Sequence, residues 1–288
     1  MKKITITLAA FFISIMIFAQ NAVNVATLSG AKIKLATGQK ITIENDISIE
    51  ASLGMGMEMI STSVSTNLLD VKNSTDKNYT ISNSLTKLKA NMSMAGQSNS
   101  YDSENKESND AEMAKIFDDR MNKSTDVVID NITGLAITEN KKDKKNNDDE
   151  NPNMAEDLMK MFSDNTDDAV VSGAFEVLPK GKNIGNSWSD TSGTKGNKTI
   201  RTYTLNSITG NEAVIGIVIV ATAKNKMEVQ GMEFEITTET KTTGEIITDI
   251  TTGLVKKRNT VSDITGSFQL MGQDMPINAK TTSTIIYK

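Results

Sequence analysis

The sequence predicts an α+β protein in which antiparallel β-structure dominates, arranged as two related curved-sheet modules that each carry a short helix. Three observations support this fold class. Long stretches alternate apolar and polar residues, two stretches place apolar residues at helical spacing, and similar segments recur in the same order in both halves of the chain. Because a period of two is typical of strands with one buried face, we expect each module to curl its sheet into a half-barrel or a sandwich-like layer.

Residues 1–19 have the features of an export signal. Two Lys residues precede an apolar run over residues 4–17, and Ala19 stands at the expected cleavage position before Gln20. The alternative, a signal anchor, needs about 20 apolar residues to span a bilayer. This run is shorter, and no Cys follows it to take a lipid. We therefore expect cleavage, a periplasmic or secreted location and no membrane span in the mature chain.

The first module is predicted over residues 20–138. Alternation runs from Ile47 to Met55, from Ile60 to Leu68 and from Leu88 to Met94, which indicates half-buried strands. A helix is expected near residues 108–123, where Met113, Ile116, Phe117 and Met121 recur at three- and four-residue steps.

A charged segment over residues 139–151 contains no apolar residue and predicts a solvated linker to the second module at 152–288. That module is expected to open with a helix, because Pro152 stands at an N1-like position before an apolar face. Strands follow, including an alternating run from Phe234 through Ile236 and Thr238 to Thr240. The run from Ala213 to Thr222 does not alternate, so we expect a strand covered on both faces.

Four stretches place a Gly beside Met or Gln where one alternating run ends and another begins. Their glycines are Gly56, Gly96, Gly231 and Gly272. Glycine tolerates the positive φ of tight hairpin turns, so the sequence predicts four hairpin tips.

The two halves also share short segments, which indicate a duplication. VVIDNITGLA at 127–136 matches IITDITTGLV at 246–255, and YTISNSLT at 79–86 matches YTLNSIT at 203–209 with a one-residue gap. GQKI at Gly38 and GNSW at Gly185 are candidate equivalent entry points. A spacing of more than 100 residues favours paired modules over a short-repeat solenoid.

The order of these features resembles a known family. An export signal, a Thr-rich β half ending in a Gly-Gln turn and YDS at 101–103, a helix, and a second half opening with VLPKGKNIGNSW at 177–188 are similar to an uncharacterised family of exported bacterial proteins, defined as a domain of unknown function. The resemblance covers nearly all of the mature chain. It implies a duplicated β-rich envelope protein and brings no known activity or catalytic residues.

The composition excludes several kinds of chemistry. The chain has no His, the usual general base near neutral pH, and no Cys to supply a thiolate nucleophile or a zinc ligand. Its net charge of −5 becomes −7 when the two Lys of the signal are removed, which argues against nucleic acid as a partner. We expect no enzymatic activity, no cofactor and no metal.

The remaining candidates are the residues that flank the tips. Met is flexible and polarizable and lines surfaces that accept varied apolar ligands, whereas the alternative is that Met fills an aromatic-poor core. The candidate ligand-binding residues are Met55, Met57, Met59, Met92, Met94, Met232, Phe234, Met271 and Met275. Two functions stay open: a carrier for an apolar small molecule or lipid on the concave face of a curved sheet, and a structural component that contacts another envelope protein.

Overall fold

The structure is a computed structural model, and it describes residues 32–52, 56, 58–94, 96–137, 166–194, 196–229, 232–270 and 273–288. The predicted signal peptide, linker, helix from residue 152, Gly231 and Gly272 lie outside these residues. Among the described residues, no helix is long and apolar enough to cross a membrane.

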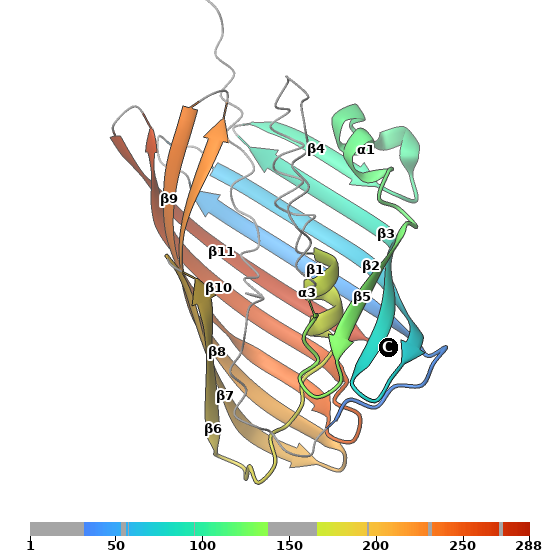
Figure 1. The fold of residues 1–288 in the computed structure, drawn as a ribbon. Helices are drawn as coiled ribbons and strands as arrows, with labels where there is room; N and C mark the ends of the chain where they lie inside the picture. Colours follow the sequence, from blue (N-terminus) through green and yellow to red (C-terminus); the bar gives the residue numbers. More distant parts are fainter. Residues whose placement is uncertain are drawn as a thin grey trace, which may run out of the picture.

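The described strands form one antiparallel 11-stranded sheet in the order β4-β3-β2-β1-β11-β10-β9-β8-β7-β6, with β5 paired to β3 (Figure 1). Their bounds are β1 Lys40–Ser52, β2 Glu58–Ser74, β3 Asn78–Met94, β4 Gln97–Asp102, β5 Ser124–Asp130, β6 Ser187–Thr194, β7 Asn197–Thr209, β8 Glu212–Val229, β9 Met232–Asp249, β10 Val255–Leu270 and β11 Gln273–Tyr287. The predicted dominance of antiparallel β-structure is therefore confirmed.

The two halves of the chain share this sheet. β1 pairs with β11, with Ile43 opposite Tyr287 and Ala51 opposite Ala279. The expectation that each module curls a sheet of its own is not what the structure shows, because this pairing joins both halves into one continuous, curved layer (Figure 1). Duplication of the modules stays a prediction.

Five hairpin connections gather at one end of the sheet, which we call the tip end. Because successive strands run in opposite directions, the connections at 52–58, 94–97, 194–197, 229–232 and 270–273 all fall on the same side. Gly56 and Gly96 have φ of +71° and +80°, as hairpin turns require. These two predicted tips are confirmed, and the strand ends that flank Gly231 and Gly272 pair directly with each other.

Side chains alternate between a concave face and a convex face. On β1 the odd-numbered residues Ile41, Ile43, Ile49 and Ala51 are buried on the concave face, around which the sheet curves in Figure 1. On β8 the odd-numbered residues from Ala213 to Ala223 are largely buried, whereas Val218 and Val220 are 41% and 37% exposed on the convex face. The prediction that this strand is covered on both faces is wrong, since only its concave side is covered.

Three short helices accompany the sheet in the described part of the chain. They are η1 Lys106–Ser108, α1 Ala111–Phe117 and α3 Thr166–Gly173. The helix predicted near 108–123 is thus present but shorter: the chain turns after Phe117, and Asn122 takes a positive φ of 60° that no helix continues through. Phe117 packs against Tyr101 on β4, with ring centroids 5.1 Å apart.

Candidate functional site

The concave face divides into two regions along the strands. At the end opposite the tips, which we call the core end, buried side chains of many strands meet α3 in the main hydrophobic core. This cluster includes Ile33, Ile41, Leu69, Ile81, Ile129, Val171, Phe175, Leu205, Ile215, Ile246 and Tyr287. The protein's own side chains therefore pack together at the core end.

One strap across the core end is the segment Ile33–Leu35. The backbone N–H of Ile33 donates to the carbonyl of Asn131, 2.8 Å away, and that of Lys34 donates to the carbonyl of Thr252, 3.1 Å away. The hydroxyl of Tyr79 donates to the Ile33 carbonyl and accepts from the Leu35 N–H, at 3.1 and 3.3 Å. This segment therefore joins the end of β5, in the first half, to the β9–β10 connection in the second.

The two turns that hold this strap are the repeated Asp-x-x-Thr-Gly segments. Asp130 Oδ1 accepts hydrogen bonds from the N–H and hydroxyl of the Thr three residues later, and Asp249 Oδ1 does the same. Each ends in a glycine, Gly134 or Gly253, with φ of +73° or +72°. The similarity of the two segments in sequence thus corresponds to the same local hydrogen bonding.

A second strap runs from α3 to Glu176. At its start, the side-chain amide of Asn83 on β3 donates to Asp167, at 2.6 Å. At its end, the Val255 N–H donates to the carbonyl of Ala174 and the Glu176 N–H to the carbonyl of Gly253, both at 2.9 Å. α3 therefore lies over the concave face and is attached to strands on both sides of it (Figure 1).

Charged side chains lie buried or half-buried beside this strap. Arg258 on β10, 7% exposed, lies 3.7 Å from the Glu176 carboxylate and 3.5 Å from the Gly173 carbonyl. Arg201 pairs with Asp190 at 2.8 Å, next to Tyr203. Burial raises the pKa of Glu176 from 4.5 to about 7, in spite of the opposing effect of Arg258. Burial, followed by the nearby Glu176 charge, also raises the pKa of Tyr203.

The tip half of the concave face has a different character. Its inward positions on the described parts of β1, β2 and β8–β11 carry mainly aliphatic, small, amide and hydroxyl side chains, and none of them is charged. The buried apolar members are Ile49, Ala51, Met59, Ala221, Ala223, Ile236, Ile264, Met275, Ile277 and Ala279. An uncharged, concave, largely aliphatic surface is suited to hydrocarbon.

Hydroxyl groups interrupt this apolar surface. Thr240 on β9 and Thr281 and Ser283 on β11 are 2%, 6% and 6% exposed. Within the described structure their side-chain oxygens make no hydrogen bond, and neither does Oδ1 of Asn45 on β1. Thr242 and Ser262, which lie in register with Thr281, hydrogen-bond to each other at 2.7 Å.

The predicted methionine site is only partly described. Met59 and Met275 are buried on the concave face, 3% and 7% exposed. Met92 is half-buried on β3. Met55, Met57 and Met271 lie outside the described residues, as do the side chains of Met94, Met232 and Phe234. Ligand binding by these residues stays a prediction.

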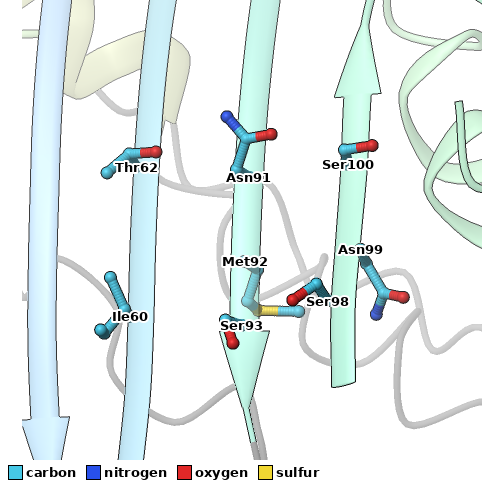
Figure 2. A pocket seen from close by; sticks show the side chains of 8 residues that line it. All are labelled: Ile60, Thr62, Asn91, Met92, Ser93, Ser98, Asn99 and Ser100. Carbon is cyan, nitrogen blue, oxygen red and sulfur yellow. The ribbon is translucent and has the colours of Figure 1, made fainter. Parts of the chain in front are cut away.

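A surface depression of 310 Å³ lies between β2, β3 and β4 near the Gly96 tip (Figure 2). It is lined by Ile60, Thr62, Asn91, Met92, Ser93, Ser98, Asn99 and Ser100. Because Met59 is buried on the concave face, its neighbour Ile60, 52% exposed, belongs to the convex face. Thr62, Asn91, Ser93, Ser98 and Ser100 share the convex face of Ile60 by strand register. Met92 lies opposite Ser61 and therefore shares the concave face with Met59, so this predicted site residue borders the depression from the concave side.

Neither the hydroxyl groups nor the buried ion pair was predicted as a site. Thr238 and Thr240 occupy the buried phase of an alternating run, which was a usable signal for polar groups on the inner face. The approach of Glu176 to Arg258 has no local signal, because distant segments bring the two together. In the described residues, no group of three or more acidic side chains has an arrangement that could hold a metal ion.

The fold and this divided concave face define a class of protein: an open, curved antiparallel sheet closed by straps at one end. The chain belongs to DUF6263, a family of unknown function, whose model matches residues 76–255. No curated protein sequence matches the chain.

Several solved structures have a partial likeness to the chain. One, titled for lipid–protein interactions in lipovitellin, is 11% identical with a TM-score of 0.46, and the match covers 88% of this chain but only 25% of that one. OccK5 of Pseudomonas aeruginosa is 7% identical with a TM-score of 0.25, covering 86% and 98% of the two chains. An outer membrane channel of Pseudomonas putida F1 is 8% identical with a TM-score of 0.25, covering 89% and 97%. All three TM-scores lie below 0.5, so these likenesses establish no shared fold.

Proposed function

We propose that this protein is an exported, non-enzymatic component of the cell envelope that binds or carries an apolar ligand on the tip half of its concave face. The observation that carries the proposal is the contrast along one surface. The core end packs against α3 in the main hydrophobic core, whereas uncharged aliphatic groups of the tip half such as Ile49, Ile264 and Ile277 are buried but do not belong to that core cluster. Export rests on the signal-like segment at residues 1–19, with a mature chain beginning at Gln20.

Native mass spectrometry of protein purified from its own envelope tests this function. The wild-type protein should retain a guest that organic extraction removes, and the intact mass should also report cleavage before Gln20. Ala279→Phe adds a ring to the concave face and should abolish retention. Thr282→Phe adds the same ring to the exposed convex side of the same strand and should leave retention unchanged. Circular dichroism shows whether both variants fold.

The alternative is a structural or protein-interaction role without a small-molecule ligand. The observation that favours it is apolar exposure on the convex face, where Val218 and Val220 of β8 and Ile60 beside the 310 Å³ depression meet solvent. Val218 and Val220 adjoin each other on the convex face of β8, and adjoining exposed apolar groups are typical of interaction surfaces. A ligand-free mass for protein taken from its own envelope, with Ala279→Phe indistinguishable from wild type, would favour this alternative.

A further inference from the structure

The buried hydroxyl groups of the concave face call for a polar partner. Burying a hydroxyl without a hydrogen bond is unfavourable, so buried polar groups in folded proteins are nearly always paired. Thr240, Thr281 and Ser283 are each more than nine-tenths buried and unpaired in the described structure, and the Asn45 amide oxygen is unpaired as well. Valine or alanine would fit these positions without that cost. The hydroxyl groups therefore destabilise the folded protein unless a partner forms hydrogen bonds with them.

The strand register places these groups on one face of adjacent strands. Ser283 lies opposite Ile47 of β1, the inward neighbour of Asn45, and Thr281 lies opposite Ile49. Thr240 lies opposite Ile264, which in turn lies opposite Ala279, so two strand spacings of about 5 Å separate β9 from β11. The unpaired groups therefore span roughly 10–15 Å across the face at that spacing.

Apolar side chains border these hydroxyl groups on the side of the tips. Ile264 and Ile277, 3% and 2% exposed, lie nearer the tips than Thr281. On the opposite side the first cation is Arg258, which is already paired with Glu176 and with the carbonyl of Gly173. A ligand that satisfies this surface therefore has hydrocarbon at the tip half and an uncharged polar group at the hydroxyls.

From this arrangement we infer that the concave face is a site for a neutral lipid whose hydroxyl and ester groups hydrogen-bond to Thr240, Thr281, Ser283 and Asn45. This inference rests on the proposed function and specifies the ligand class. Hydroxyl groups donate and accept, and an amide oxygen accepts, so together they match a head group that contains both hydroxyl donors and ester acceptors. A carboxylate head group would find no unpaired cation among the described residues of this surface.

Binding of three probes that share one type of hydrocarbon chain tests the inference. The probes are monooleoylglycerol, oleate and 1-octadecene, each titrated into the purified protein after removal of any bound lipid. Monooleoylglycerol should bind most tightly. The double variant Thr281→Val/Ser283→Ala should weaken its binding about tenfold, as expected for lost hydrogen bonds in a buried site, and should leave 1-octadecene within about twofold. Thr282→Val, on the convex side of the same strand, should change neither.

Thermal unfolding supplies a second readout. Without ligand, the double variant should unfold at the same temperature as wild type or higher, because it no longer buries unpaired hydroxyl groups. A variant that keeps full affinity for monooleoylglycerol, or a wild-type protein that prefers oleate, would overturn the inferred ligand class. Failure of all three probes to bind would instead overturn the proposed function, so the two failures are distinguishable.

Discussion

The Glu176 carboxyl gives the most quantitative prediction, because the structure sets both the sign and the size of its effect on stability. Its side chain is 15% exposed, and its burial raises the pKa from 4.5 to about 7. A raised pKa means that the folded state binds the proton more tightly than the unfolded state. The stabilising contribution of the protonated group is therefore complete below about pH 4.5 and is lost as the pH rises to about 7.

The magnitude follows from the difference between the two pKa values. At about 1.4 kcal/mol per pKa unit, a rise from 4.5 to about 7 corresponds to roughly 3 kcal/mol of unfolding free energy. Arg258 opposes the shift, and Asp190 adds to it, so this figure already includes their charges. Glu176→Gln removes the titration while keeping the size of the side chain.

Urea unfolding at several pH values between 4 and 8 measures the effect, with Trp188 as the fluorescent reporter because it stacks on Tyr203, beside the buried charges. The stability of Glu176→Gln minus that of wild type should grow by roughly 3 kcal/mol between pH 4.5 and 7.5, then level off. Glu212→Gln, which removes an exposed partner of Lys256, is the control and should change stability by less than about 1 kcal/mol. A flat difference would refute the burial of Glu176, and a difference of opposite sign would mean that its attraction to Arg258 outweighs desolvation.

Three further predictions concern the straps and the methionines. Gly134→Ala should destabilise the protein more than Gly38→Ala does in thermal unfolding. Both glycines have a positive φ, but a Cβ at Gly134 would lie 2.5 Å from the Cβ of Phe175, whereas the space around Gly38 is open. Equal losses of stability would contradict this packing. Tyr79→Phe removes the hydroxyl that bridges the first strap and should cost about 1–2 kcal/mol in urea unfolding, so an unchanged stability would show that the bridge contributes nothing. Met59→Ala should cost roughly 2–5 kcal/mol, and Met59 and Met275 should resist peroxide in the folded protein; rapid oxidation of either would contradict its burial.

Local patterns predicted the strands well because a half-buried strand alternates apolar residues on its buried face with polar residues on its exposed face. The alternation around Ile47 and Ile60 predicted β1 and β2, and the glycines between runs predicted the tips at Gly56 and Gly96. The collection of all tips at one end then follows from antiparallel order alone. The repeated Asp-x-x-Thr-Gly segments were also visible, although their role in holding the Ile33 strap required the structure.

The sequence was misleading where an apolar residue type does not correspond to a buried position. The run from Ala213 to Thr222 is apolar at nearly every position, yet Val218 and Val220 face solvent, because β-branched residues favour strands whether or not they are covered. Similarly, the apolar spacing near residues 108–123 continues beyond Phe117, but the helix does not. The pairing of Glu176 with Arg258 depends on how α3 crosses the sheet, which no local pattern encodes.

The central claim is that the tip half of the concave face holds an apolar ligand, and photo-crosslinking tests it most directly. A monoacylglycerol with a photoreactive group in its acyl chain would be bound to the protein, irradiated and mapped by peptide mass spectrometry. We expect labels on concave residues such as Ile49, Ile264 and Ile277 and none on the convex residues Val218 and Val261. Labelling confined to the convex face, or equal labelling of both faces, would contradict the account.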